Sequence, residues 1–209
     1  MLQHLVSWPR EHAEPPHPCL VLLHGRGSNE QDLFGLVPQL PKRPLVLSVR
    51  APNPFGWGGY FWYDFTGEQG RPDESTLNSS LDQLRELLVA LPEKYQVDAS
   101  QVYLLGFSQG ALMSGTMTLK EPELIAGTIM LSGYLPEIDV KGDGVTGKPV
   151  FMAHGTNDGV LPVVMARQAR LRLEELRAEL EYHEYAMEHE VSLDELNDLQ
   201  RWFQARGLR

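Results

Sequence analysis

Residues 101–110 read QVYLLGFSQG, an apolar run followed by the pattern G-x-S-x-G with Ser108 at its centre. The run 101–105 predicts a buried strand, and a helix is expected from residue 108 to residue 120. A serine on a tight turn between a strand and a helix is placed to act as a nucleophile, and glycines flank it because the turn leaves little room for side chains. The helix N-terminus also favours negative charge that develops there. The alternative is an ordinary serine cap with glycines that allow close packing.

Strand-like and helix-like patterns alternate on both sides of this motif. Short apolar runs predict strands at residues 19–23, 44–49, 125–131, 149–153 and 181–187. Helices are predicted at residues 77–91 and 163–176, and after the capping-box patterns that begin at Ser28 and Ser192. Residues 51–75 are rich in Gly, Pro and aromatic residues and are expected to form a long loop. The alternation predicts an α/β fold with a mostly parallel central sheet, helices on both faces, and a site at the carboxyl ends of the strands.

A nucleophilic serine needs a base, and the base needs an acid that orients it. On a strand–elbow–helix scaffold the expected chain order is serine, then Asp or Glu, then His. Asp158 follows the strand predicted at 149–153, and His189 follows the strand predicted at 181–187. We therefore expect Ser108, Asp158 and His189 to form a catalytic triad. The alternative for Asp158 is a turn residue before Gly159.

The other histidines fit the role of base less well. Three of them precede the predicted core, and the fourth falls inside a predicted strand; they are, in order, His4, His12, His17 and His183. His24 and His154 each stand before a glycine directly after a strand, where a hydrogen bond that braces the loop is expected. His183 and His189 are spaced as in neither H-E-x-x-H nor H-x-x-E-H, so no metal site is predicted.

Acyl transfer also requires donors for the negative charge that develops on the carbonyl oxygen. One donor is expected from the backbone N–H of Gln109, the residue after the serine, and the other from a loop after an early strand. The turn His24-Gly25-Arg26-Gly27 follows the strand at 19–23 and makes the Arg26 N–H the candidate. The alternative is a tight glycine turn without a catalytic duty.

Residues 55–65, FGWGGYFWYDF, concentrate seven aromatic side chains in eleven positions. These side chains either line an apolar wall for the substrate or anchor the loop in the core, and the sequence leaves both interpretations open. Trp57, Phe61 and Trp62 are the candidate substrate contacts. Exposed aromatics near the site could also serve a homodimer interface.

The composition limits the classes of protein that fit. The chain has 209 residues, 42% hydrophobic and 22% charged, as expected for one globular domain spanning residues 1–209. A net charge of −10 argues against binding to nucleic acid or to an anionic membrane surface. No run approaches the roughly 18 apolar residues of a membrane span, and the N-terminal residues do not form a signal peptide. With one cysteine, Cys19, expected to be buried, the predicted location is cytoplasmic.

Together, several segments resemble the phospholipase/carboxylesterase family, which includes the acyl-protein thioesterases. The segments are LVLLHGRGSNEQDL, FWYDF, VYLLGFSQGALMS, MLSGYLP, HGTNDGVLP and HEVSLDELNDLQRWF. The resemblance implies a compact α/β-hydrolase without a large cap domain, acting on small esters or thioesters such as lysophospholipids or acyl thioesters, with no cofactor. It maps the triad and the two oxyanion donors onto the five residues already named.

This sequence departs from the family pattern beside the histidine. Many relatives have Gly before it, whereas here Glu188 and Glu190 flank it. If these carboxylates lie near the imidazole, they would favour its charged form and shift the onset of activity to higher pH. Ala111 also stands where many relatives have a second glycine after the elbow. The alternatives to an esterase are another hydrolase on the same scaffold, a peptidase or a lactone hydrolase, and a non-catalytic small-molecule-binding protein.

Overall fold

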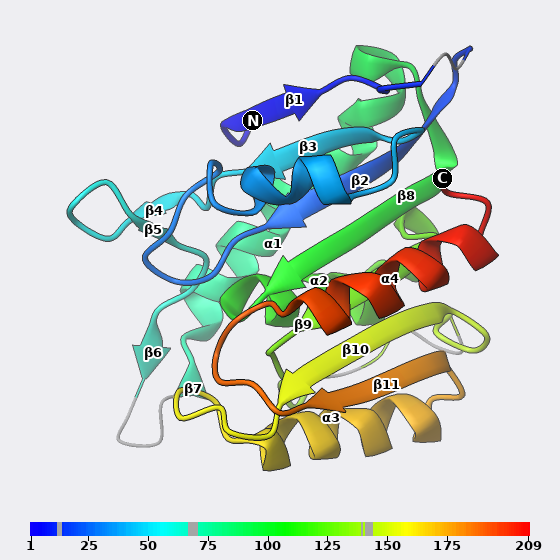
Figure 1. Ribbon diagram of the computed structural model, residues 1–209. Helices are drawn as coiled ribbons and strands as arrows, with labels where there is room; N and C mark the ends of the chain where they lie inside the picture. The colour runs from blue at the N-terminus through cyan, green and yellow to red at the C-terminus, as the bar shows by residue number, and fades with distance from the viewer. Residues whose placement is uncertain (12–13, 67–70, 139, 141–143) are drawn as a thin grey trace.

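The computed structural model describes residues 1–11, 14–66, 71–138, 140 and 144–209 (Figure 1). Its centre is a seven-stranded sheet in the order β1-β3-β2-β8-β9-β10-β11. The strands are β1 (His4–Ser7), β2 (His17–Leu23), β3 (Leu45–Val49), β8 (Val97–Phe107), β9 (Gly127–Leu131), β10 (Pro149–Gly155) and β11 (Glu179–Tyr185). All neighbours pair in parallel except β1, which runs antiparallel to β3 at the edge. The predicted α/β class with a mostly parallel sheet is confirmed.

The apolar runs form strands that are buried on both faces. Every residue of β2 and β3 is buried, which explains why these segments show no alternation of apolar and polar residues. The two sides of β2 nevertheless contribute to different cores, because successive side chains of a strand point to opposite faces. Cys19, Val21 and Leu23 pack in one hydrophobic cluster, and Leu20 and Leu22 pack in the other.

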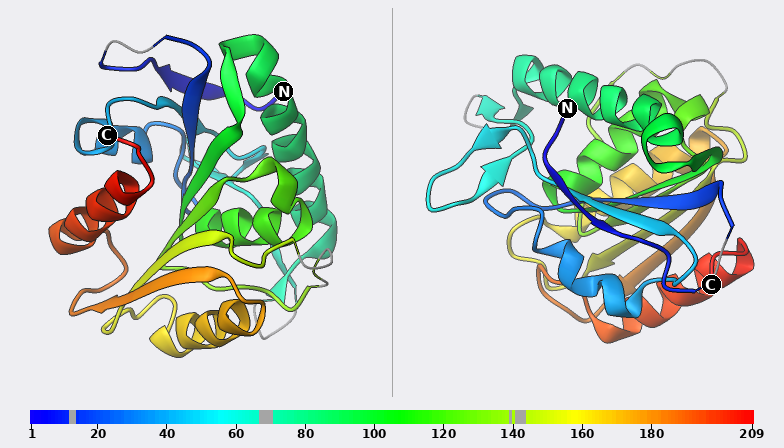
Figure 2. Two further views of the ribbon diagram at one scale, coloured as in Figure 1. Left: turned by 90° about the vertical axis from the view of Figure 1, so that its right-hand side faces the viewer. Right: turned by 90° about the horizontal axis from the view of Figure 1, so that it is seen from above.

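Helices cover both faces of the sheet (Figure 2). The helices α1 (Glu74–Tyr95), α2 (Gln109–Lys120) and α3 (Val163–Glu175) pack on one face, and η1 (Leu33–Gln39) and α4 (Leu193–Ala205) pack on the other. The short η2 (Pro122–Leu124) leads into β9. The side chain of Asp73 caps α1 by accepting the N–H of Thr76 at 2.9 Å. No helix among the described residues is long and apolar enough to cross a bilayer.

One predicted capping box forms and the other does not. Ser192 accepts the N–H of Glu195 while the Glu195 carboxylate accepts the N–H of Ser192, so α4 begins as expected. The helix predicted from Ser28 is wrong: the first helical segment is the 3₁₀ helix η1, which begins at Leu33. The Ser28 hydroxyl instead donates to Asp32, and the buried carboxylate of Glu30 forms an ion pair with Arg50.

The predicted loop at residues 51–75 contains two short antiparallel ladders. The first joins β4 (Asn53–Pro54) to β5 (Tyr60–Phe61), and the second joins β6 (Phe65–Thr66) to β7 (Arg71–Pro72). An isolated bridge pairs Tyr60 with Ser28, so this segment lies beside the turn that follows β2. Two-residue strands leave no periodic pattern in a sequence, and the first edge strand, β1, is also too short to be recognised from periodicity.

Candidate active site

Ser108 occupies a tight, strained turn between β8 and α2. Its backbone has φ of 55° and ψ of −116°, a conformation that side-chain-bearing residues rarely adopt. A Cβ on Gly106 would collide with the backbone of Gly110, and a Cβ on Gly110 would collide with the carbonyl oxygen of Leu23 on the adjacent β2. The two glycines of the motif are therefore required by the close approach of α2 to the sheet, and the turn presents the serine at the carboxyl end of β8.

The structure brings the three predicted residues together in one hydrogen-bonded row. The Oγ of Ser108 lies 3.0 Å from Nε2 of His189, and Nδ1 of His189 lies 2.7 Å from Oδ2 of Asp158. A carboxylate only accepts hydrogen bonds, so Nδ1 carries the ring proton and Nε2 is left to accept the serine hydroxyl. The Asp158 side chain is fully buried, whereas that of His189 is 16% exposed. The row thus runs from the interior to the surface.

Three hydrogen bonds hold the Asp158 carboxylate, and a second histidine lies beside it. Its Oδ1 accepts the N–H groups of Val160 and Leu161, each at 2.8 Å, and Oδ2 faces both His189 and Nε2 of the buried His154, the latter at 3.3 Å. Burial alone would raise the pKa of this carboxyl, but the hydrogen bonds from His189 and from the two backbone N–H groups outweigh burial and hold the pKa below its ordinary value. The carboxylate therefore stays charged although it is buried.

The loop that carries His189 is fastened at both ends. β11 ends at Tyr185, four residues before the histidine, and the N–H of Asn157 donates to the carbonyl oxygen of Met187 at 3.1 Å. The capping box of α4 closes the other end of the loop. The ring of Phe107 packs against the His189 ring with centroids 4.9 Å apart. These contacts fix the position of the imidazole.

The turn after β2 lies against the serine. A Cβ added to Gly25 would lie 3.4 Å from Cβ of Ser108. The carbonyl oxygen of Gly25 accepts Nδ1–H of His24 at 2.7 Å, while Nε2 of His24 accepts the N–H of Ala51 at 3.0 Å. Burial lowers the pKa of His24, and because Nε2 accepts the N–H of Ala51 it carries no proton, so the ring is neutral. The N–H of a trans peptide points away from its C=O, so fixing the Gly25 carbonyl fixes the direction of the Arg26 N–H.

Within the described residues, neither the N–H of Arg26 nor that of Gln109 has a hydrogen-bond acceptor. Gln109 is the first residue of α2, where an N–H has no partner inside the helix. Both predicted donors thus carry an unused N–H beside Ser108.

His24 and His154 both make the loop-bracing hydrogen bonds expected of them. His24 bonds to Gly25 and Ala51, and Nε2 of His154 donates to the carbonyl oxygen of Leu161 at 2.8 Å.

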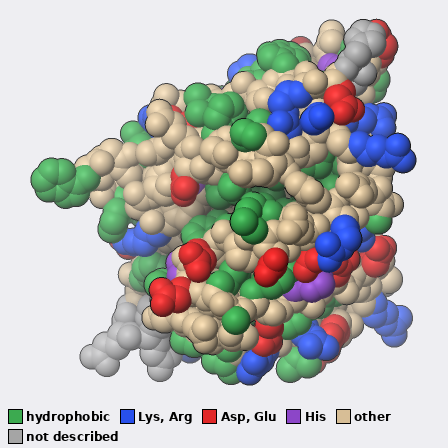
Figure 3. Space-filling view, viewed as in Figure 1, with side chains coloured by type: hydrophobic (Ala, Val, Ile, Leu, Met, Phe, Trp, Pro, Cys, Tyr) green, Lys and Arg blue, Asp and Glu red, His purple; other side chains and the backbone are tan. Residues whose placement is uncertain are grey.

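The three candidate substrate contacts occupy different environments. Trp57 is fully exposed at the tip of the β4–β5 turn, where hydrophobic side chains project from the body of the molecule (Figure 3), and Phe61 is half-buried. Trp62 is fully buried, and its indole N–H donates to the carbonyl oxygen of His24 at 2.9 Å. With no exposed surface, Trp62 does not line an open pocket in this structure, and the anchored-loop alternative describes it.

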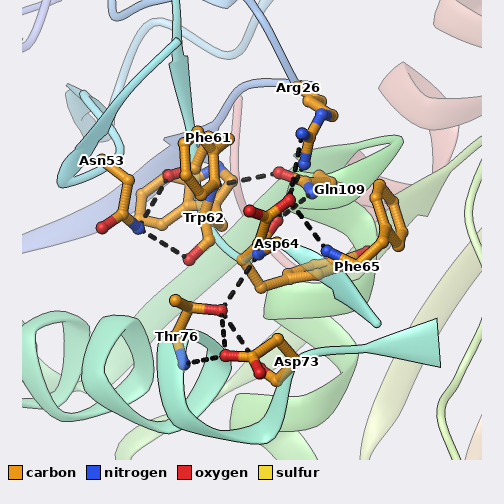
Figure 4. Close-up of polar contacts among 10 residues, drawn as sticks. Arg26, Asn53, Phe61, Trp62, Asp64, Phe65, Asp73, Thr76 and Gln109 are labelled. Carbon is orange, nitrogen blue, oxygen red and sulfur yellow. Dashed lines mark hydrogen bonds and ion pairs between the residues drawn. The ribbon is translucent and has the colours of Figure 1, made fainter. Parts of the chain in front are cut away.

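Polar contacts tie this aromatic segment to its surroundings (Figure 4). Nδ2 of Asn53 donates to the carbonyl oxygens of Phe61 and Trp62, and the Gln109 side chain contacts the backbone of Trp62 and Tyr63. No sequence pattern predicts these contacts, because they join side chains to the backbone of distant residues.

The two glutamates beside the histidine are exposed. Among the described residues, no hydrogen bond or ion pair joins Glu188 or Glu190 to His189, whose polar partners are Ser108 and Asp158. In the part of the chain that the structure describes, no group of three or more His, Cys, Asp or Glu side chains is arranged to hold a metal ion.

One hollow on the described surface is lined by other residues. It has a volume of about 870 Å³ and lies between α1, α2, α3 and the segment after β9. Its lining mixes apolar side chains, such as Leu77 and Leu135, with charges of both signs, such as Lys120 and Glu137, and it contains none of the three residues of the row. The predicted site residues therefore lie outside the lining of this hollow, after the carboxyl ends of the strands.

Comparison with known proteins agrees with the fold. The phospholipase/carboxylesterase family model matches residues 10–206. Acyl-protein thioesterase 1 of Mycosarcoma maydis is 27% identical over 95% of this chain and 95% of its own length, and that of Debaryomyces hansenii is 24% identical over 89% and 90%. The crystal structure of the Bacillus cereus carboxylesterase matches with a TM-score of 0.87 at 26% identity, covering 98% of this chain and 94% of that one. This chain belongs to the phospholipase/carboxylesterase family and is a serine hydrolase that acts on esters.

Proposed function

We propose that this enzyme cleaves carboxylic esters or thioesters through an acyl-enzyme on Ser108, with His189 as base and Asp158 as the acid that orients it. The observation that carries the proposal is the continuous row Asp158–His189–Ser108, with hydrogen bonds of 2.7 Å and 3.0 Å. An isolated serine, or a histidine paired only with a carboxylate, would not supply a nucleophile. The row supplies a hydroxyl, a proton acceptor and a fixed charge in the order that acyl transfer needs.

In the first half-reaction, Nε2 of His189 takes the proton of Ser108 as Oγ attacks the acyl carbon. The imidazole then gives the proton to the leaving alcohol or thiol, whose bond to the acyl carbon breaks. In the second half-reaction, a water molecule loses a proton to the same nitrogen and attacks the acyl-enzyme, and Ser108 leaves with that proton. The net change is hydrolysis of one ester or thioester by one water.

The buried charge of Asp158 supports this sequence of steps. The imidazolium that forms in each half-reaction is stabilised by the carboxylate 2.7 Å from Nδ1. The lowered pKa of Asp158 keeps that charge in place at neutral pH and below. In each tetrahedral intermediate, the N–H groups of Arg26 and Gln109 would hold the oxyanion, since both are unused in the structure and flank the serine.

The surroundings favour substrates with an apolar acyl group. Phe55, Trp57 and Phe65 are exposed and Phe61 is half-buried, so the loop beside the turn after β2 presents an apolar surface to solvent. The relatives named acyl-protein thioesterase suggest thioesters as one class of substrate. We therefore propose small esters and thioesters of apolar acids, with Trp57 and Phe61 as contacts for the acyl group.

Covalent labelling tests the nucleophile directly. A fluorophosphonate probe is expected to add one adduct per chain, located at Ser108 by peptide mass spectrometry. Ser108→Ala should take up no label, while Ser114→Ala, which removes a buried hydroxyl of the same helix, should label as the wild type does. Labelling at another residue, or none in a folded wild type, would overturn the assignment of Ser108.

A further inference from the structure

The carbonyl oxygen of Tyr63 is a meeting point for two side chains from different loops. Nε2 of Gln109 donates to it at 2.7 Å, and NH1 of Arg26 donates to it at 3.2 Å. A carbonyl oxygen has two lone pairs, so this one is saturated by the two donors. Arg26 and Gln109 are also the two residues whose backbone N–H groups are unused beside Ser108.

The side-chain amide of Gln109 is held in one orientation by hydrogen bonds at both of its ends. It is buried, and its Oε1 accepts the N–H of Trp62 at 3.0 Å while its Nε2 serves Tyr63. The backbone N–H of Trp62 can only donate and the carbonyl of Tyr63 can only accept, so the orientation of the amide is determined by its partners. Both ends of the amide thereby pair with the same short stretch of backbone, and the first turn of α2 is fixed to it (Figure 4).

The side chain of Arg26 is held just as closely. Its second nitrogen, NH2, lies 3.2 Å from Oδ1 of Asp64, and its guanidinium carbon lies 4.6 Å from the ring centroid of Phe55 and 5.0 Å from those of Phe61 and Phe65. Three aromatic faces, a carboxylate and a carbonyl therefore surround one cation. This cage fixes the side chain although it is 27% exposed.

The backbone beside Arg26 is tied to the same segment. The N–H of Gly27 donates to the carbonyl oxygen of Tyr60 at 2.8 Å, and the N–H of Tyr60 donates to the carbonyl oxygen of Ser28 at 2.7 Å. The segment 60–64 is thus bonded to the turn after β2 and to the start of α2. It is itself anchored by Thr76, whose hydroxyl accepts the N–H of Asp64 at 3.0 Å, and by Asp73 behind it.

We propose that the side chains of Arg26 and Gln109 are positioning groups that meet at the Tyr63 carbonyl and thereby set the distance between the two oxyanion-hole N–H groups. The inference rests on the proposed function, because it assigns a role to the donors of the proposed oxyanion hole. The Arg26 donor lies on the turn after β2 and the Gln109 donor lies at the start of α2, after β8, and the shared carbonyl links these two segments directly. A donor that drifts by a fraction of an ångström stabilises the tetrahedral intermediate less, while the bound ester is little affected.

The test uses variants that keep both backbone N–H groups. Arg26→Met and Gln109→Met retain unbranched stems but remove the donors to Tyr63. Each is expected to lower kcat for p-nitrophenyl butyrate by about 10- to 100-fold, with KM changed by less than about threefold. The inhibition constant of an aryl trifluoromethyl ketone, which forms a tetrahedral oxyanion on the serine, should rise by the same factor as kcat falls. The double variant should lose less than the product of the two single losses, because both act on one carbonyl.

Ser80→Ala is the matched control. The Ser80 hydroxyl donates to the carbonyl oxygen of Trp62 at 2.5 Å, so the variant removes a buried hydrogen bond from the neighbouring peptide without touching Tyr63. It should keep kcat within about twofold of the wild type. Arg26→Lys keeps the cation but lacks the planar fork, so an intermediate kcat is expected, and this variant gives the same test if Arg26→Met does not fold.

These experiments distinguish a failure of the positioning role from a failure of the proposed esterase function. If the wild type turns over and labels at Ser108 but Arg26→Met and Gln109→Met match Ser80→Ala in kcat, the positioning role is overturned while the esterase stands. Losses confined to KM, with an unchanged ketone inhibition constant, would overturn it as well. A folded wild type that neither turns over esters nor labels would overturn the proposed function, and this inference with it.

Discussion

Nε2 of His189 lies 3.0 Å from Oγ of Ser108, although the two residues are 81 positions apart in the chain. Two strands, β9 and β10, separate β8 from β11 in the sheet, so the histidine reaches the serine only because its loop runs back across the strand ends. Asp158 follows the intervening β10, and its carboxylate fixes the orientation of the imidazole through the hydrogen bond to Nδ1. We therefore predict that the activity depends on groups that hold this loop, as well as on the three side chains of the proposed triad.

Asp158→Asn tests the acid of the row. An asparagine would keep the size of the side chain but could present an N–H to Nδ1 of His189, which stabilises the wrong tautomer. We expect kcat to fall by about 10³- to 10⁴-fold while the circular dichroism spectrum stays that of the wild type. A folded variant within tenfold of wild-type kcat would remove Asp158 from the mechanism.

Glu195 makes stability depend on pH. Its side chain is fully buried, and its Oε1 has no hydrogen-bond partner among the described residues. Burial raises its pKa from 4.5 to about 8 against the opposing hydrogen bond from Ser192. Between these two pH values the folded chain binds a proton that the unfolded chain has lost, so the free energy of unfolding falls as pH rises. The loss between pH 6 and pH 8 is about 2–3 kcal/mol, at 1.36 kcal/mol per unit.

Glu195→Gln removes this titration and keeps an oxygen for the capping box. The variant should therefore be more stable than the wild type at pH 9, by about 5 °C in Tm, and should lack the decline between pH 6 and pH 8. Thermal denaturation of both proteins across this range is the measurement. Parallel Tm curves for the two proteins would show that Glu195 does not titrate in this window.

Gly110 allows α2 to approach the sheet. A Cβ at this position would collide with the carbonyl oxygen of Leu23, which belongs to the rigid backbone of β2. Gly110→Ala should therefore destabilise the protein by more than about 4 kcal/mol or prevent folding. Gly35→Ala is the control, because no atom lies within 4 Å of the added methyl and its backbone conformation suits alanine. Urea denaturation compares the two, and equal midpoints would contradict the close-packing argument.

Trp57 tests the apolar surface beside the site. The side chain is fully exposed, so Trp57→Ala should leave Tm unchanged. If it contacts the acyl group, kcat/KM should fall by about tenfold for a p-nitrophenyl ester of a long-chain acid and by less than about twofold for the acetate. Trp62→Ala provides the contrast, since truncating a fully buried indole should lower Tm and reduce activity on both esters alike. Equal losses on both esters for Trp57→Ala would exclude a role in acyl recognition.

The parts of the fold that could be predicted from the sequence are those set by local pattern. Buried parallel strands are continuous apolar runs, and the stripe of leucines on α1 has helical spacing, so both were recognisable. The helix expected after Ser28 failed because the matching letters form a different local structure: Asn29 accepts the N–H of Gln31 in a turn, and Glu30 pairs with Arg50. A capping-box pattern shows that the side chains can cap a helix, but contacts with distant residues determine whether those hydrogen bonds form.

Part of the candidate site could likewise be predicted from the sequence, and part could not. Ser108, Asp158 and His189 could be located because each follows a strand, and strand ends of a parallel sheet meet at one edge. The aromatic segment could not be resolved into exposed and buried members, because no periodicity distinguishes Trp57 from Trp62 in an irregular loop. The bonds that join Gln109 and Arg26 to the Tyr63 carbonyl use a backbone atom, which every residue has, and so leave no trace in the sequence.

Ser108 as nucleophile is best tested by steady-state hydrolysis of p-nitrophenyl esters, from acetate to long-chain acids, by the wild type and by Ser108→Ala. We expect turnover by the wild type and a fall of about 10⁴-fold or more in kcat for the variant, with an unchanged circular dichroism spectrum. Turnover by Ser108→Ala within tenfold of the wild type would contradict the assignment of Ser108 as the nucleophile.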